Sequence, residues 1–296
     1  MNTQPRIRRS WLYAAASLLA LHTATASAYL VTTEPGDSAP LPAGTNLGVL
    51  YYQHAERNEL MVDGHQTNSD FRLDSDIVLA RYVKWTTLGG FLVTPQVIVP
   101  WGHLNNSGTG GSSESAFGDP FVGGNIWLLN DAVNERYFSL GTYIGVPLGS
   151  YDGDNGGMNI GENRWKAAFE VNYVHALIAS RLYAEMTLER DWFGRNDDYL
   201  GATLKQDPVF EVQAHLRYVL NPSNQLGLTY IHTTGGENRL GGQALNDGLN
   251  TARYLLTWSH SFSPKVHLQT QAGQDLDVNN GPQENLRVHL RLAYLF

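Results

Sequence analysis

The sequence has no cysteine, few basic side chains and, after its first segment, no long apolar run. With no cysteine among 296 residues, it can form neither a disulfide framework nor a thiolate metal site. Lys and Arg number 20 against 28 Asp and Glu, a formal net charge of −8, which argues against a nucleic-acid partner. No later window holds the roughly 18 apolar residues of a spanning helix. A secreted β-sandwich and a membrane β-barrel both remain possible.

The first segment predicts export. "MNTQPRIRRS" is basic, "WLYAAASLLALHTA" is apolar, and "ASA" at positions 26–28 is a small-residue cleavage site, so residues 1–28 are interpreted as a signal peptide. An uncleaved anchor helix is the alternative, but the apolar stretch is shorter than the roughly 20 residues that span a bilayer. Residues 29–44, with three prolines, predict a periplasmic or lumen-inserted N-terminal segment, and residues 45–296 a single barrel domain.

Alternation of apolar and polar residues between turn signals predicts twelve strands. Most reach the roughly 9 to 11 residues that a tilted membrane strand needs. Their connections alternate between short ones such as "NPS" and long ones rich in Gly, Asn and Asp, the asymmetry of outer-membrane barrels with periplasmic turns and extracellular loops. The predicted strands are 46–54, 72–85, 89–100, 118–129, 136–146, 164–175, 180–190, 208–220, 224–233, 250–262, 264–275 and 286–296.

The polar face of these strands is predicted to line a lumen. Twelve strands enclose less space than an open porin, so we expect a narrow, partly filled passage. The charged residues inside it could form a cross-strand ion-pair lattice or act as a selectivity filter, and the lattice is favoured. The N-terminal segment is a candidate plug. The predicted pore-lining residues are Lys166, Glu170, Asn172, Arg181, Glu185, Glu189, Glu211, Gln213, His215, Arg217, Arg253, His267, Gln269, Gln271, Arg287, His289 and Arg291.

The apolar face carries aromatic residues near both strand ends, which predicts two girdles at the membrane interfaces. A symmetric turn across "TTLGG" pairs Trp85 with Phe91 and Val83 with Val93, and it places Arg81 on the lipid side, where it would snorkel or mark a bulge. The predicted lipid-facing girdle residues are Trp85, Phe91, Trp101, Trp165, Trp192, Trp258, Tyr294 and Phe296.

The last strand, "RVHLRLAYLF", ends on Phe296 and resembles the C-terminal signal by which outer-membrane proteins are recognised by the barrel-assembly machinery. Its physical role would be to pair with the first strand, because an open sheet edge in lipid leaves backbone groups unsatisfied. Outer-membrane lipid and lipopolysaccharide are the other expected partners.

Signatures of catalysis and of cofactor or metal binding are scarce. GxSxG, HExxH and Walker motifs are missing, and "SYDGDNGG" is only half a calcium loop, so we expect no enzyme activity, no cofactor and no metal. A barrel phospholipase, for which His175 and His260 are the candidate histidines, remains an alternative. A structural or adhesive barrel with a closed lumen is another.

Three segments carry a family resemblance: "FGDPFVGGNIWLL" (117–129), "SLGTYIGVPLGSYDG" (139–153) and "GENRWKAAFEVNY" (161–173). They resemble the core of the outer-membrane transporters linked to the meta-pathway of phenol degradation, through the Gly118-Asp119-Pro120 turn, the Val146-Pro147-Leu148-Gly149 exit and the Asn163-Arg164-Trp165 entry. Leu148 stands where that family usually has Thr or Ser. The resemblance implies passive uptake of small, aromatic or hydrophobic compounds across the outer membrane of a Gram-negative bacterium, and it implies no catalytic residue.

Overall fold

The structure is a computed structural model that describes residues 32–68, 70–108 and 111–296. The predicted signal peptide, residues 1–28, lies outside the described residues. Within them, no helix combines the length and the apolar character needed to cross a bilayer.

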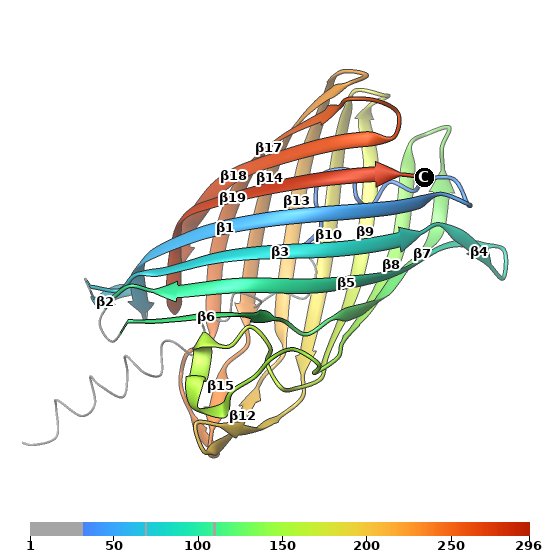
Figure 1. The fold of residues 1–296 in the computed structure, drawn as a ribbon. Helices are drawn as coiled ribbons and strands as arrows, with labels where there is room; N and C mark the ends of the chain where they lie inside the picture. The colour runs from blue at the N-terminus through green and yellow to red at the C-terminus, as the bar shows by residue number, and fades with distance from the viewer. Residues whose placement is uncertain (1–31, 69, 109–110) are drawn as a thin grey trace, which may run out of the picture.

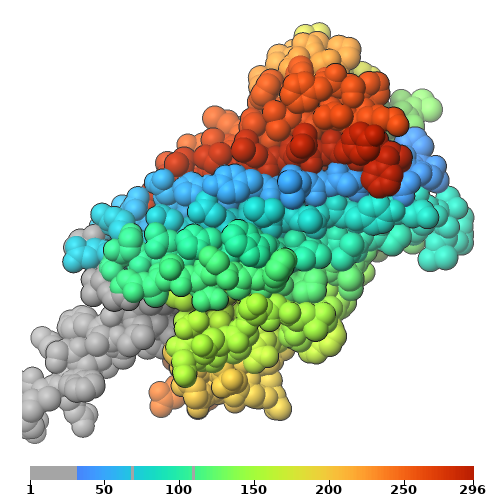
Figure 2. Space-filling view, in the orientation of Figure 1, coloured from blue at the N-terminus to red at the C-terminus, as the bar shows by residue number. Residues whose placement is uncertain are grey.

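Twelve long antiparallel strands form one closed sheet in the described part of the chain (Figure 1). Each pairs with the next long strand, and β19 pairs with β1 from Leu47–Leu295 to Met61–Gly281. Figure 2 shows the red C-terminal strand lying against the blue N-terminal strand. The predicted twelve-stranded up-and-down barrel is therefore confirmed. Its strands are β1 (Asn46–Val62), β3 (Leu73–Lys84), β5 (Phe91–Asn106), β7 (Phe121–Asp131), β8 (Arg136–Gly145), β9 (Lys166–Ile178), β10 (Leu182–Phe193), β13 (Val209–Asn221), β14 (Asn224–Gly235), β17 (Leu249–Ser261), β18 (Val266–Val278) and β19 (Gly281–Leu295).

Several strands run past their predicted ends on the long-loop side. β1 has 17 residues and β19 has 15, whereas roughly 9 to 11 suffice to cross a membrane. Only residues 279–280 separate β18 from β19, so the connection predicted between residues 275 and 286 is largely strand. The barrel wall therefore projects beyond the bilayer at this end.

Short elements decorate the projecting end. β2 (His65–Asn68) and β6 (Ser112–Phe117) extend the main sheet there, and η2 (Gly153–Met158) is a 3-10 segment in the β8–β9 loop. A second sheet joins the β10–β13 and β14–β17 loops, below the barrel in Figure 1. Its strands are β11 (Asn196–Tyr199), β12 (Ala202–Gln206), β15 (Asn238–Leu240) and β16 (Gln243–Ala244). At the other end β4 (Thr86–Leu88) pairs with β5.

Outward-pointing side chains form an apolar exterior. Leu256 is 57% exposed, and on β19 Leu290, Leu292 and Tyr294 alternate with inward-pointing residues. Seven predicted girdle residues are also exposed: Phe91, Trp101, Trp165, Trp192, Trp258, Tyr294 and Phe296. Water would not stabilise so much exposed apolar area, whereas acyl chains do.

Trp85 and Arg81 point inward, so their predicted placement on the lipid side is wrong. Trp85 is 6% exposed and packs with Val83 inside the barrel. Val83 pairs with Gln96, and Leu88 rather than Trp85 pairs with Phe91. The physical reason is that β3 carries apolar residues on both faces, so alternation alone did not identify the face that points outward.

The interior has two different walls. The inner faces of β9 to β19 are mainly polar, as predicted, whereas those of β1 to β8 carry three apolar clusters. One cluster at the long-loop end includes Met158 and Ile160 of the β8–β9 loop, which pack in the same cluster as Leu73 and Leu104. An apolar inner wall was not expected from the sequence.

Candidate functional site: the lumen

Most of the predicted pore-lining side chains are buried inside the barrel. Arg181 is the exception: it is exposed at the β9–β10 turn, and its Nε donates to the Tyr218 hydroxyl at 2.9 Å. His267, Arg287 and Arg291 are partly buried. The buried residues are Lys166, Glu170, Asn172, Glu185, Glu189, Glu211, Gln213, His215, Arg217, Arg253, Gln269, Gln271 and His289.

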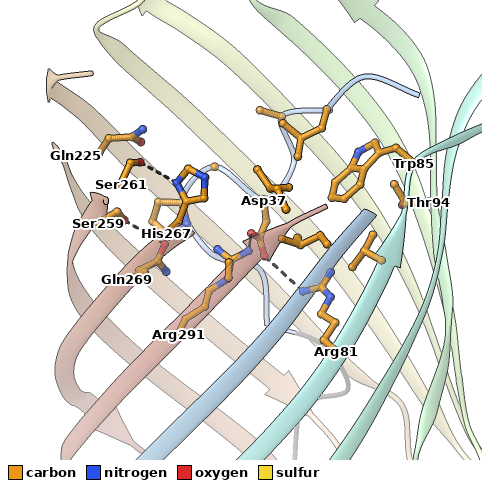
Figure 3. Close-up of a pocket in the computed structure, with 18 of the residues that line it drawn as sticks. Asp37, Arg81, Trp85, Thr94, Gln225, Ser259, Ser261, His267, Gln269 and Arg291 are labelled. Atoms are coloured by element: carbon orange, nitrogen blue, oxygen red, sulfur yellow. Dashed lines mark hydrogen bonds and ion pairs between the residues drawn. The ribbon is translucent and has the colours of Figure 1, made fainter. Parts of the chain in front are cut away.

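A cavity of about 460 Å³ lies in the lumen toward the short-turn end (Figure 3). On one side Ser259 and His267 come from the polar strands β17 and β18. On the other side Trp85 and Val83 follow the apolar wall. The cavity therefore has one wall that can donate and accept hydrogen bonds and one that can pack against hydrocarbon.

The N-terminal segment crosses the lumen beside this cavity. Thr33 donates through its N and Oγ1 to Gln213 Oε1, at 2.9 and 2.7 Å. Gly36 N donates to Glu185 Oε2 at 2.8 Å, and Trp127 Nε1 donates to the Ser38 carbonyl at 3.2 Å. These contacts reach β13, β10 and β7, so the segment is held against several strands of the inner wall.

Two carboxylates of the segment pair with arginines of the wall. Asp37 lies between Arg291, at 3.0 Å, and Arg81, at 3.6 Å (Figure 3). Glu34 lies 3.2 Å from Arg291 and accepts a hydrogen bond from Gln269 at 2.8 Å. Burial raises the pKa of Glu34 to about 7, although Arg291 opposes the shift. The segment thus supplies much of the negative charge that neutralises these arginines.

A row of acidic side chains lines β9, β10 and β13 nearer the long-loop end. Glu189 is the register partner of both Glu170 and Glu211, and Asp191 follows on the same face. All four are at most 1% exposed, and Glu189 and Asp191 have carboxylate oxygens without hydrogen-bond partners among the described residues. Register neighbours on one face lie roughly 5 Å apart, where like charges repel, so the row cannot be fully ionised.

Across the lumen from the acidic row, three arginines and two carboxylates form an ionic cluster. Glu284 lies 2.6 Å from Arg57 and 3.1 Å from Arg253, and it also pairs with Arg287. Arg253 additionally contacts Asp275 at 2.8 Å. The expected cross-strand ion-pair lattice therefore exists here, but it does not extend to the acidic row.

The three motif segments meet at the long-loop end of the barrel. Asp119 Oδ1 accepts from Gly149 N at 3.0 Å and its Oδ2 from Glu162 N at 2.9 Å. Glu162 in turn binds Arg164 at 2.6 Å and Lys166 at 2.8 Å. Burial raises the pKa of Asp119, against the influence of Lys166 and the two backbone amides.

Glycine makes this convergence possible. A Cβ on Gly149 would lie 2.6 Å from the Gly118 carbonyl carbon, and one on Gly161 would lie 2.6 Å from the Ser150 carbonyl oxygen. The motif glycines thus pack backbone against backbone. Sequence reasoning singled out the motifs but could not show that they touch, because Gly118-Asp119-Pro120 precedes β7 whereas the other two motifs lie at opposite ends of the β8–β9 loop.

Comparisons with known proteins agree with the barrel and the motifs. A model of the family described as "Putative MetA-pathway of phenol degradation" matches residues 61–292. The crystal structure of the COG4313 outer membrane channel from Pseudomonas putida F1 is 33% identical, with a TM-score of 0.85 over 90% of this chain and 100% of that one.

More distant structures share only the barrel fold. The transport unit of the autotransporter AIDA-I from Escherichia coli is 7% identical with a TM-score of 0.57, over 96% of this chain and 97% of that one. The translocator domain of NalP from Neisseria meningitidis is 11% identical with a TM-score of 0.51, over 97% and 98%. A search of curated proteins gives no match.

Proposed function

Because the chain belongs to the family of the putative MetA-pathway of phenol degradation, we propose that it is an outer-membrane channel for passive uptake of small aromatic or hydrophobic molecules. The similarity to an outer membrane channel over the whole length of that protein supports the channel function. No binding site for a nucleotide or other energy source is needed for passive flow down a gradient.

The observation that carries this proposal is the pairing of apolar clusters with a polar wall inside one barrel. Leu47, Val83 and Trp85 give a hydrocarbon ring a surface to pack on, while Ser259 and Gln269 offer hydrogen bonds opposite. Ligand sites commonly combine a mainly apolar lining with a few placed polar groups, in volumes of roughly 300 to 1,000 Å³. A uniformly charged bore would instead suit hydrophilic solutes.

The predicted pore-lining residues are proposed to form the wall of the passage, and the N-terminal segment to restrict it. The contacts of Thr33, Gly36 and Asp37 with strands around the barrel support this restriction. We also propose the barrel-assembly machinery as the partner of β19, whose exposed outer face ends on Phe296.

Solute flux tests the proposal. Purified protein in planar bilayers should give discrete channel openings, and proteoliposomes should take up phenol or benzyl alcohol faster than empty liposomes of the same lipid. The absence of both conductance and accelerated uptake would remove the channel function.

A hydrolase is the second candidate because one serine–histidine pair lies on the outer surface. Ser115 Oγ is 2.6 Å from His103 Nδ1, and Asp76 is the register partner of His103. However, the Asp76 carboxylate already accepts from Tyr52 at 2.6 Å and contacts His54 at 2.8 Å. Among the earlier candidates, His260 contacts Asn224 at 2.9 Å rather than a serine. We therefore propose a protein without catalytic activity, and ester hydrolysis lost in Ser115→Ala would reverse that assignment.

A further inference from the structure

The cavity near the short-turn end has a lining with an excess of positive charge. Three arginines line it, Arg81, Arg217 and Arg291, whereas Asp37 is the single lining carboxylate among the described residues. Glu34 and Glu185, which pair with Arg291 and Arg217, are not part of the lining. The guanidinium groups therefore face the cavity, while two of the three carboxylates that pair with them lie behind its lining.

Two hydrogen-bond donors at the cavity lack acceptors among the described residues. They are the indole Nε1–H of Trp85, which is 6% exposed, and the Nε–H of Arg291. A buried donor without a partner costs roughly 1 to 3 kcal/mol, so an acceptor oxygen that reached either group when Asp37 is displaced would recover that cost. Trp85 also presents an aromatic surface beside Leu41 and Leu47.

Asp37 shows how a carboxylate is held at this place. It belongs to the N-terminal segment and not to the barrel wall, yet its two oxygens contact Arg291 and Arg81, at 3.0 and 3.6 Å. The segment is connected to the wall by side-chain and backbone hydrogen bonds rather than by strand pairing. A free carboxylate of the same geometry can therefore compete for the same guanidinium groups.

From this geometry we infer that the cavity selects small aromatic carboxylates, whose carboxylate takes the place of Asp37 on Arg291 and Arg81 while the ring packs against Trp85. The inference rests on the proposed channel function and narrows its solute class from aromatic compounds in general to aromatic anions. It also makes the N-terminal segment an internal competitor that the solute displaces.

Equilibrium binding separates this inference from the channel function. Isothermal titration of the purified full chain in detergent, against a micelle blank, would compare benzoate, benzyl alcohol and acetate at pH 7.5. Benzoate should bind most tightly, because benzyl alcohol lacks the charge and acetate lacks the ring. Conductance of the same preparation is measured independently, so that a failed channel and a failed anion site give different results.

Three variants locate the site. Arg291→Gln should weaken benzoate binding tenfold or more, since it removes a charged hydrogen-bond partner, and should change benzyl alcohol binding little. Asp37→Asn should strengthen benzoate binding, by up to about tenfold, because the competing carboxylate is gone. Arg239→Gln, an exposed loop arginine paired with Asp207, is the matched control and should leave binding unchanged.

The inference would be overturned if benzoate and benzyl alcohol bound with equal affinity, or if Arg291→Gln and Arg239→Gln lost benzoate affinity equally. Neither result would contradict the proposed channel function for aromatic compounds. Acetate binding as strong as benzoate would also overturn it, since the ring would then contribute nothing. If Arg291→Gln does not fold, the Asp37→Asn variant decides: unchanged or weaker benzoate binding would contradict the competition on which the inference depends.

Discussion

Asp119 offers a sharp test of how the motif segments hold the outer loops. Its carboxylate accepts hydrogen bonds from Gly149 N and Glu162 N, and it lies 4.0 Å from Lys166 Nζ. Asp119→Asn keeps the shape but turns one acceptor into a donor, which faces a backbone N–H. Asp119 is 2% exposed, so water cannot replace the lost bond.

The magnitude follows from the two hydrogen bonds. A hydrogen bond to a charged group contributes about 1.5 to 3 kcal/mol, and a buried donor left unpaired costs roughly 1 to 3 kcal/mol. One bond is lost and the other becomes neutral, which sums to about 3 kcal/mol. At 1.4 kcal/mol per tenfold change, protection of the Gly149 and Glu162 amides against hydrogen exchange should fall on the order of 100-fold.

Hydrogen exchange followed by mass spectrometry on peptides covering residues 146–165 measures this directly. The matched control is Asp197→Asn, which removes an exposed partner of Arg195 and should change protection little, because surface ion pairs contribute about 0 to 1 kcal/mol. The thermal unfolding of the barrel should stay nearly constant in both variants, since the strand ladder is untouched. If the protection factors of these amides in Asp119→Asn stay within threefold of the wild-type values, the hydrogen bonds of Asp119 do not hold the loops.

Three further expectations concern packing and pH. Gly161→Ala places a Cβ 2.6 Å from the Ser150 carbonyl oxygen, so it should lower the local stability of the loop by roughly 1 to 3 kcal/mol. Gly48→Ala is the control, because its Cβ would meet its nearest atom at 3.8 Å and should leave the loop unchanged. The same hydrogen-exchange experiment compares the two variants. Glu189→Gln relieves like-charge repulsion in the acidic row, so the midpoint of thermal unfolding should rise at pH 7.5 and the gain should vanish near pH 4, where carboxylates are neutral; a lower midpoint at pH 7.5 would contradict the description of the row. Burial raises the pKa of Glu34 from 4.5 to about 7 in the docked segment, so the docked form holds a proton that the undocked form has lost. Docking should therefore weaken as the pH rises from 4.5 to about 7. Channel conductance should increase across this pH range, and Glu34→Gln should remove the pH dependence.

The sequence by itself determined the class of fold and most inward and outward directions. Alternation with period two requires opposite faces, and on β13 the inward Gln213, His215 and Arg217 alternate with the outward Ala214 and Leu216. The alternation of short turns and long loops also indicated a membrane barrel, because such barrels have short turns at one end and longer loops at the other. These features are local, so neighbouring residues suffice to predict them.

Tertiary structure alone decided the two-sided character of the lumen. Strands with apolar residues on both faces, such as β3, have no preferred orientation until they pack, and closure placed Arg81 and Trp85 inside. It also brought Asp37 to Arg291, more than 250 residues away in the chain, and joined the turn before β7 to both ends of the β8–β9 loop around Asp119. Such contacts depend on where the barrel closes, and the residue pattern within one segment does not predict which distant segment it will contact.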